Sequence, residues 1–484
     1  MNQSSIFFQK EFINMKKTKI ICTLGPASET ETVISALFDA GMNVARLNFS
    51  HGTHAEHAKK IAIIHKIREE RHIPLPVMLD TKGPEFRIRT FRNQKITLKK
   101  GDTFTFTTED IVGDETRVSV SYQGICEELQ PGDKILLNNG LISFEVKEVR
   151  PPEVITEVLI GGETSDHKSM FFPDKELHMD YLSEQDKKDL AFGVEQGVEF
   201  IACSFVSKAQ DILDVKSYLK ELGGEHIDVI AKIENRAGVR NLEEIINACE
   251  GIMVARGDLG VEIPFEELPD IQKHIITTCR IKGKRVITAT EMLESMIKQP
   301  RPTRAEISDV ANAVYDGSSA VMLSGETAAG LYPVEAVEAM SRICIQAEKN
   351  TQYIGVLDED AVEIHSLNEA LSHSACTMAH DIGAKCIVVC TRTGTTARMV
   401  SRFRPLIDII GMTTDEKAYQ QLALSWGVIP MMAEEYSSVD VLFHFAKRAA
   451  KDSGLAKPGD MVVITGGNPN GKSGNSSLIN IERI

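Results

Sequence analysis

The sequence predicts a (β/α)₈ barrel that carries an inserted all-β domain and is followed by a separate α/β domain. Three observations lead to this fold class. Eight short apolar runs, most of them separated by helical patterns, occur before residue 330; one long gap between them alternates apolar and polar residues; and a new strand–helix pattern begins after Ile345. The predicted parts are an N-terminal extension at 1–14, a barrel at 15–84 and 174–345, the insert at 85–173, and the last domain at 346–484.

The predicted barrel strands are short and apolar, and each ends in polar residues or glycine. Helical patterns such as ETVISALFDAG and SEQDKKDLAFGVEQG lie between most of them. Eight strand–helix units are the number that closes a (β/α)₈ barrel. The runs cover residues 18–26, 43–50, 76–83, 200–206, 228–235, 251–258, 285–293 and 320–327.

The insert lies between Gly83 and about Pro173. Segments such as TFTFTTED and RVSVSYQ alternate apolar and polar residues between glycine-containing turns, which predicts β-strands. Because the insert follows the third predicted strand, it leaves from the C-terminal face of the barrel, where barrel active sites lie. We therefore expect a lid that excludes water when it closes.

The C-terminal part predicts a second α/β unit. Its apolar runs alternate with helical stretches. The predicted strands cover residues 386–391, 407–414, 428–435 and 461–467, and LINIERI at the C-terminus predicts a final strand.

Charge and cysteine content restrict the class of protein. Lys and Arg total 54, Asp and Glu total 69, and the net charge is −15. This balance argues against nucleic acid or an anionic membrane as the main partner, so an anionic substrate would need a local basic pocket. Nine scattered cysteines without a CxxC pair predict a reduced, cytoplasmic protein. No apolar run is long enough to span a bilayer. Residues 1–14 lack a signal-peptide core, and we expect them to be either a disordered extension or the result of an upstream start.

Polar residues stand two apart at three of the predicted strand ends. Such residues point to one side of a strand, and at the carboxyl ends of barrel strands they converge on one pocket. A single pair would fit a buried polar layer equally well, but several pairs favour a site. The residues are Arg46, Asn48 and Ser50; Lys232 and Glu234; Ser324 and Glu326; with Asp80, Asp258 and Thr290 at the same end.

Glu234 and Asp258 are hard oxygen ligands of the kind that Mg²⁺ prefers, and Lys232 would remain beside them as a cation. The alternative interpretation is a buried ion pair between Lys232 and Glu234.

Three glycine-containing segments are candidates for phosphate binding. ARGDLG (255–260) could offer backbone N–H groups around Gly257, although Gly-Asp also marks ordinary turns. GGNPNGKS (466–473) matches the P-loop pattern, but the residues after it predict a strand instead of the helix that a P-loop needs. TRTGTTAR (391–398) follows a strand and opens a helix, so it is either a phosphate site or a Thr N-cap without a ligand.

Taken together, these segments resemble the pyruvate kinase family from about Met15 to the C-terminus. The most specific segments are MVARGDLGVEIP (253–264) and PTRAEISDVANAV (302–314). The resemblance implies transfer of the phosphoryl group of phosphoenolpyruvate to ADP, giving pyruvate and ATP. It also implies a barrel, an inserted lid and a C-terminal effector domain, which agrees with the pattern described above.

The resemblance implies a role for each matching residue. Glu234 and Asp258 would hold Mg²⁺ or Mn²⁺, and Lys232 would neutralise charge on the phosphoryl group. The substrate-binding set would be Ala255, Arg256, Gly257, Asp258, Thr290, Arg46 and Lys232. The K⁺ ligands would be Asn48, Ser50, Asp80 and Thr81. The nucleotide-binding set would be His51, Arg87, Lys168 and Asn48. Thr290, Ser324 and Glu326 would form the proton path to the enolate. In this family Glu at the position of Glu85 goes with K⁺ dependence, which we predict here.

The resemblance further implies an effector site for a sugar phosphate or nucleotide, allosteric activation, a homotetramer and a cytoplasmic location. The effector residues would be Thr391, Thr393, Gly394, Thr395, Thr396, Gly471, Lys472 and Ser473. Under this interpretation both phosphate-binding loops of the C-terminal part serve regulation.

The chain departs from the common family pattern at Glu291, at Ser319, at Asn138–Gly140 and around Ser169. Three alternatives stay open at this point: a catalytically weak regulatory relative, a P-loop ATPase, and another metal-dependent barrel such as a carbon–carbon lyase. The metal- and substrate-binding residues named above are all retained, so we expect activity.

Overall fold

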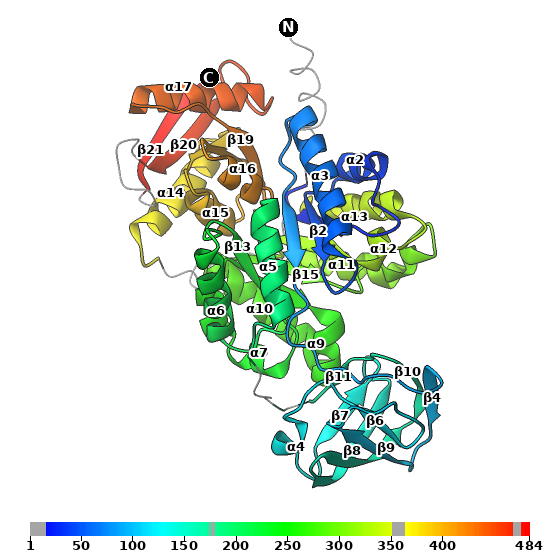
Figure 1. The fold of residues 1–484 in the computed structure, drawn as a ribbon. Helices are drawn as coiled ribbons and strands as arrows, with labels where there is room; N and C mark the ends of the chain where they lie inside the picture. The colour runs from blue at the N-terminus through cyan, green and yellow to red at the C-terminus, as the bar shows by residue number, and fades with distance from the viewer. Residues whose placement is uncertain (1–15, 174, 176–179, 351–363, 468–475) are drawn as a thin grey trace.

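The structure is a computed structural model that describes residues 16–173, 175, 180–350, 364–467 and 476–484. The barrel lies in the middle, with the all-β insert at one end and the C-terminal α/β unit at the other (Figure 1). The extension predicted at 1–14 lies outside the described residues.

Eight parallel strands close the barrel in the order β1-β16-β15-β14-β13-β12-β3-β2. Closure pairs Lys19 of β1 with Ala320 of β16, about 300 positions apart in the chain. All eight predicted strands are therefore confirmed. They are β1 (Lys19–Thr23), β2 (Val44–Asn48), β3 (Val77–Asp80), β12 (Phe200–Cys203), β13 (Asp228–Ile233), β14 (Gly251–Ala255), β15 (Arg285–Ala289) and β16 (Ala320–Leu323).

Helices surround the barrel and begin at the caps that the sequence supplies. Thr303 caps α11 in a capping box with Glu306, and Gly317 ends that helix at a φ of 101°. The helices are α2 (Glu31–Ala40), α3 (His54–Arg71), α5 (Glu184–Gln196), α6 (Ala209–Glu221), α7 (Arg236–Arg240), α8 (Leu242–Ala248), α9 (Arg256–Glu262), α10 (Leu268–Ile281), α11 (Arg304–Asp316), α12 (Gly325–Ala328) and α13 (Pro333–Glu348). Two short 3₁₀ turns cover Phe265–Glu267 and Glu294–Ile297.

The insert is all-β apart from one short helix, as predicted. Its larger sheet has the order β11-β7-β8-β9-β5-β6, and β10 pairs with β4. Side chains of β9 alternate between buried and half-exposed, which is the predicted two-residue period. The elements are β4 (Lys95–Leu98), β5 (Thr103–Thr107), β6 (Arg117–Ser119), α4 (Ile125–Glu128), β7 (Lys134–Leu137), β8 (Ile142–Arg150), β9 (Glu153–Ile160), β10 (Gly162–Ser165) and β11 (Met170–Phe171).

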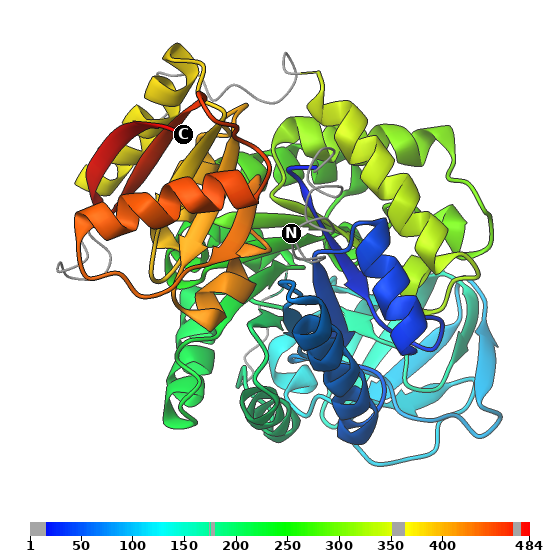
Figure 2. The same cartoon turned by 90° about the horizontal axis from the view of Figure 1, so that it is seen from above.

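The C-terminal unit is a five-stranded sheet of order β19-β18-β17-β20-β21 with helices on both faces. Helix α17 crosses one face of the sheet (Figure 2). Strand β21 runs antiparallel to β20, so the predicted final strand is confirmed. The elements are α14 (Leu367–Asp381), β17 (Cys386–Cys390), α15 (Thr395–Arg402), β18 (Asp408–Thr413), α16 (Glu416–Leu422), β19 (Val428–Met432), α17 (Val439–Asp452), β20 (Met461–Gly467) and β21 (Ser476–Arg483).

The C-terminal unit packs on the end of the barrel where the strands begin. Lys19 Nζ donates to the Val428 carbonyl at 2.8 Å, and Arg285 Nη2 donates to the Gln421 carbonyl at 3.0 Å. Leu424 is fully buried among the side chains that fill the barrel interior. The insert follows β3 at the opposite end, where the strands finish. The C-terminal unit therefore leaves the carboxyl ends of the barrel strands open for a functional site.

All nine cysteines are free and lie in buried or half-buried positions. Within the described ranges, no helix has both the length and the apolar character needed to cross a membrane.

Candidate active site

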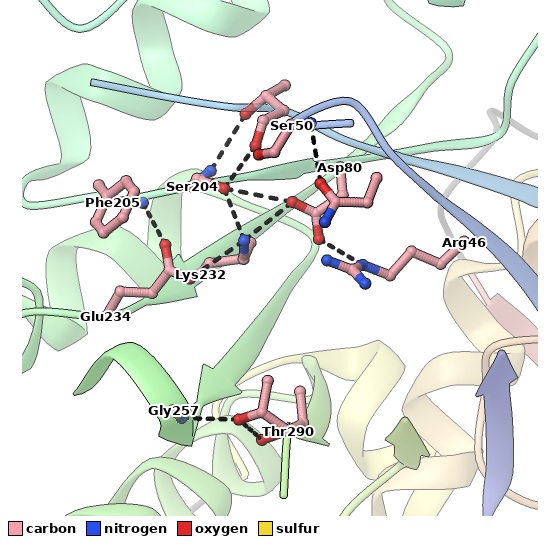
Figure 3. Close-up of polar contacts among 12 residues, drawn as sticks. Arg46, Ser50, Asp80, Ser204, Phe205, Lys232, Glu234, Gly257 and Thr290 are labelled. Carbon is pink, nitrogen blue, oxygen red and sulfur yellow. Dashed lines mark hydrogen bonds and ion pairs between the residues drawn. The ribbon is translucent and has the colours of Figure 1, made fainter. Parts of the chain in front are cut away.

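A buried network of charges lies where β2, β3 and β13 end (Figure 3). Lys232 Nζ is 2.9 Å from Asp80 Oδ1 and 3.2 Å from Glu234 Oε1. Arg46 Nε donates to Asp80 Oδ2 at 2.7 Å, and Arg46 Nη1 donates to Thr23 Oγ1 at 2.8 Å. The predicted convergence of these residues is thus confirmed in space. It includes the ion pair between Lys232 and Glu234 that was the alternative interpretation.

Lys232 and Asp80 keep their charges despite burial. Burial alone would lower the pKa of Lys232, but the Asp80 and Glu234 carboxylates outweigh it and raise that pKa. Burial likewise favours neutral Asp80, yet Arg46 and Lys232 lower the pKa of this carboxyl below its usual value. The site therefore presents fixed positive charge in a region that excludes most water.

Two contacts to the network come from residues that the sequence analysis missed. Lys232 Nζ donates to Ser204 Oγ at 2.6 Å, and this hydroxyl donates to the Thr81 carbonyl at 2.7 Å. The Phe205 N–H donates to Glu234 Oε2 at 2.6 Å, from a backbone with a φ of 56°. Both residues directly follow β12, so their place at a strand's carboxyl end was the available signal.

Glu234 and Asp258 form a pair of carboxyls, of which Glu234 is almost fully buried. Burial raises the pKa of Glu234 to about 7, with Lys232 lowering it and Asp258 raising it. Burial raises the pKa of Asp258 as well. Two neighbouring carboxylates in a buried site repel each other when both are ionised. A divalent cation bound between them would offset this repulsion, so the pair is a suitable set of metal ligands. Mg²⁺ usually takes one or two carboxylates, so this pair is of the size that it binds.

The ARGDLG segment is helical, so the ordinary turn that was its alternative interpretation is wrong. Helix α9 starts at Arg256 directly after β14, and the Gly257 N–H donates to Thr290 Oγ1 at 2.8 Å. Arg256 is buried; it donates to the Thr290 and Glu291 carbonyls and to both oxygens of Asp309. Thr290 has a φ of 67°, an uncommon conformation for a β-branched residue. Arg256 therefore stabilises the turn that orients the Thr290 hydroxyl.

Ser324 and Glu326 do not share one side of a strand, because β16 ends at Leu323 and Glu326 lies in α12. The expected strand geometry is wrong for this pair. Glu326 is buried and accepts from the Ser324 and Leu293 N–H groups at 2.7 and 3.0 Å. The buried Ser324 Oγ has no hydrogen-bond partner in the described part of the chain.

The predicted K⁺ ligands are all oxygen donors, the type that hard cations bind. Asn48 Oδ1 accepts from the Ser50 N–H at 3.0 Å, and Thr81 Oγ1 accepts from the Ser204 N–H at 3.3 Å. Asp80 adjoins them through the backbone, since its carbonyl accepts from the Phe49 N–H at 3.0 Å.

Models of two protein families match the chain. The model described as pyruvate kinase, barrel domain, matches residues 15–337, and the one described as pyruvate kinase, alpha/beta domain, matches residues 369–482. The chain belongs to the pyruvate kinase family. It is therefore a phosphotransferase, and the P-loop ATPase and lyase interpretations lose their support.

Individual pyruvate kinases are similar along nearly the whole chain. The pyruvate kinase of Clostridium perfringens is 44% identical over 97% of this chain and 100% of its own length. That of Geobacillus stearothermophilus is 45% identical over 97% of this chain and 80% of its own. A crystal structure of a pyruvate kinase from Cryptosporidium parvum superposes with a TM-score of 0.91 at 37% identity, covering 100% of this chain and 99% of that one.

At the base of the lid, residues 85–87 contact residues 167–169 and are not part of the Lys232 network. Arg87 pairs with Glu85 at 2.7 Å and donates to the His167 carbonyl, also at 2.7 Å. Glu85 also accepts from the Ser169 hydroxyl. Lys168 is half-buried, and His51 is exposed beyond β2.

The predicted effector loops lie in the C-terminal unit. Helix α15 begins after Gly394, which has a φ of 76° and offers no capping side chain, so the Thr N-cap alternative is wrong. Thr393 and Thr395 hydroxyls are 3.0 Å apart beside it, and Thr391 and Thr396 are buried. Gly471, Lys472 and Ser473 lie outside the described residues.

Proposed function

We propose that the chain transfers the phosphoryl group of phosphoenolpyruvate to ADP, giving pyruvate and ATP, in the last step of glycolysis. The observation that carries the proposal is the buried Lys232 ammonium, 2.9 Å from Asp80 with Arg46 beside it, at the mouth of the barrel. Phosphoryl transfer depends on alignment and charge neutralisation more than on covalent help. A cation that stays charged in a water-poor site supplies that neutralisation.

Glu234 and Asp258 are the proposed ligands of Mg²⁺ or Mn²⁺. When bound, the ion supplies charge neutralisation at the phosphoryl and enolate oxygens. Asn48, Ser50, Asp80 and Thr81 are the proposed K⁺ ligands, all at the ends of β2 and β3.

The remaining steps belong to the chain's own groups. Lys232 neutralises the transferring phosphoryl group, and Arg46 binds its oxygens. The Ala255–Gly257 backbone and Thr290 bind the substrate carboxylate, which would replace the bond from the Gly257 N–H to Thr290 Oγ1. Thr290 then lies on the proton path to the enolate, with Ser324 and Glu326 behind it. His51, Arg87, Lys168 and Asn48 bind the nucleotide phosphates, and the 85–173 lid excludes water on closing.

The dependence of activity on K⁺ tests the proposed function and the K⁺ site together. ATP formation from phosphoenolpyruvate and ADP with Mg²⁺ is expected to rise severalfold when tetramethylammonium chloride is replaced by KCl at equal ionic strength. The reason is that a bound K⁺ ion would add positive charge to the site that binds the anionic substrates. A coupled assay of pyruvate release measures it. Activity that does not depend on K⁺ would support the proposed reaction but refute the K⁺ site. The absence of ATP formation in either salt would refute the proposed function.

The raised pKa of Glu234 predicts a pH-dependent effect of Mg²⁺ on stability. Its pKa is about 7 in the folded chain and 4.5 ordinarily, so between these values the folded protein holds a proton that the unfolded chain has lost. Without metal, stability therefore falls as pH rises through this window. Mg²⁺ binds the charged form, so the Tm increase that it causes should grow between about pH 5.5 and about pH 8.

Thermal unfolding with and without MgCl₂ measures this increase. In Glu234→Gln the carboxyl is gone, and the pH dependence of the Mg²⁺ effect should largely disappear. An equal Mg²⁺ effect at every pH in the unmodified protein would contradict the assignment of Glu234 as a ligand.

Regulation and assembly are further parts of the proposal. A sugar phosphate or nucleotide activates the enzyme from the site of Thr391, Thr393, Gly394, Thr395, Thr396, Gly471, Lys472 and Ser473. The active form is a homotetramer in the cytoplasm. The boundaries of the barrel, the lid and the C-terminal domain lie between residues 84 and 85, 173 and 174, and 345 and 346. The separate family matches to residues 15–337 and 369–482 support the last of these boundaries, and the helix start beside Thr393 and Thr395 supports the effector site.

A further inference from the structure

The turn between β2 and α3, residues 48–52, carries several of the residues proposed to bind K⁺ and the nucleotide. Asn48 and Ser50 are proposed K⁺ ligands, and Asn48 and His51 belong to the proposed nucleotide-binding set. Ser50, His51 and Gly52 are exposed, so neighbouring side chains do not enclose this part of the turn. Exposed connecting segments are mobile unless specific contacts order them. The contacts that order this turn therefore decide how its ligands are presented.

The turn is held at its start by a neighbouring strand and at its end by His57 of α3. The Phe49 N–H donates to the Asp80 carbonyl at 3.0 Å. His57 Nε2 donates to the His51 carbonyl at 2.9 Å. Burial lowers the pKa of His57, which keeps the ring neutral near pH 7. A carbonyl oxygen only accepts, so the single proton of this neutral ring lies on Nε2.

The ring of His57 also holds the buried side chain of the turn. It stacks on the Phe49 ring, with the centroids 4.1 Å apart and the planes at 12°. The Phe192 ring of α5 lies 5.7 Å from Phe49 and stacks on His54 at 4.5 Å. His54 Nε2 in turn lies 2.6 Å from Asp189 Oδ1, also of α5. His57 therefore contacts both the backbone and a side chain of the turn, from a position in a packed helix.

Packing alone does not explain a histidine at this position. His57 is 4% exposed, and its buried Nδ1 has no hydrogen-bond partner in the described part of the chain. A buried polar atom without a partner costs stability, and an aromatic ring without nitrogen could stack on Phe49 in the same way. The bond from Nε2 to the turn is the contact that requires a histidine.

We propose that His57 is a positioning residue that orders the β2–α3 turn for the binding of K⁺ and of the nucleotide. The inference rests on the proposed function, because it concerns how Asn48, Ser50 and His51 are held. Without the Nε2 bond, an ion that binds the turn must also order it, and the free energy of ordering is lost from binding. Once the ion is bound, the turn is ordered in either case. Loss of the bond should therefore weaken K⁺ binding and leave the rate at saturating K⁺ nearly unchanged.

His57→Phe tests this role, because it removes the hydrogen bond and keeps a ring that can stack. The K⁺ concentration that gives half-maximal ATP formation is expected to rise about fivefold, the factor that corresponds to one hydrogen bond of about 1 kcal/mol. At saturating K⁺, phosphoenolpyruvate and ADP, kcat should stay within about twofold of the wild-type value. KCl is exchanged for tetramethylammonium chloride at constant ionic strength. A purely structural role would instead lower the Tm or kcat without changing the K⁺ requirement.

A second readout does not depend on activity. KCl is expected to raise the Tm of the wild type relative to tetramethylammonium chloride, and His57→Phe should need about five times more KCl for the same increase. If the wild type forms no ATP in either salt, the proposed function fails, but this comparison of Tm values still decides the role of His57.

Three further variants make the test specific. His57→Gln keeps an N–H donor without the ring, so its K⁺ requirement should lie between those of the wild type and His57→Phe. His57→Leu also lacks the donor and is smaller, and it replaces His57→Phe, with the same expectation, should that variant not fold. His65→Phe is the matched control, because it replaces a half-buried histidine eight positions further along α3 and should keep the wild-type K⁺ requirement.

Three results would overturn the role of His57. One is an unchanged K⁺ requirement in the folded variant, by activity and by Tm alike. Another is an equal change in His65→Phe, which would mean that any substitution in α3 has this effect. The third is a wild type whose activity and Tm are both indifferent to K⁺, since the turn would then hold no cation.

Discussion

Replacing Lys232 with Met is expected to reduce kcat for ATP formation about 10²–10³-fold, because one fixed positive charge at the transferring phosphoryl group is lost. This corresponds to about 3 kcal/mol or more of transition-state stabilisation. The ammonium is buried, 2.9 Å from Asp80 and 3.2 Å from Glu234, so solvent cannot replace it readily. A coupled assay at saturating phosphoenolpyruvate and ADP measures the change.

The control for this variant separates catalysis from folding. Removing Lys232 leaves the buried Glu234 carboxyl without its cation and Asp80 with Arg46 alone, which can itself destabilise the barrel. Circular dichroism and the Tm show whether the variant is folded, and Lys232→Arg keeps the charge but changes its position. Lys188→Met removes an exposed lysine of the same barrel and should keep full activity. Near-wild-type turnover in folded Lys232→Met would refute the role given to this lysine.

Replacing Leu424 with Ala is expected to lower the free energy of unfolding by about 2–5 kcal/mol, the cost of a cavity left by a buried leucine. Leu424 comes from the C-terminal unit but is fully buried with interior residues of the barrel such as Phe200 and Met253. The change should therefore lower the stability of the barrel, although the residue lies outside the barrel's segments. Urea unfolding followed by Trp426 fluorescence, two positions away, measures it.

Leu406→Ala is the matched control for Leu424. Leu406 lies in the same unit and is 59% exposed, so its truncation should change stability by less than about 0.5 kcal/mol. Equal midpoints for Leu424→Ala and the wild type would show that the two parts of the protein do not share a core.

Much of the fold could be predicted because its signals are local. Each of the eight barrel strands is a short apolar run that ends in polar residues, and the lid strands alternate with a period of two. The conformation after a strand was harder to predict. Glu326 and Gly257 were expected on a strand end or turn and lie in helices, because two or three polar residues carry too little periodicity to distinguish these states.

The candidate site could be predicted in part for the same reason. Arg46, Asp80 and Lys232 stand at strand ends, and parallel strands bring their carboxyl ends to one face of the barrel. Ser204 has the same position after β12 but was missed, since a lone serine does not stand out from an ordinary strand end. The part played by Arg256 in holding Thr290 could not be predicted, because Asp309 and the Thr290 carbonyl are more than 30 positions away.

The sequence by itself determined the class of protein: a barrel with an inserted β-domain and a C-terminal α/β unit, with cations and carboxylates at strand ends and with the family motifs. These features depend on residue type and short spacing, which a linear chain displays directly. Only the tertiary structure decided that Ser204 binds Lys232 and that Leu424 fills the base of the barrel. Such contacts depend on barrel closure, strand register and the docking of two units, and these are set by the packing of the whole chain.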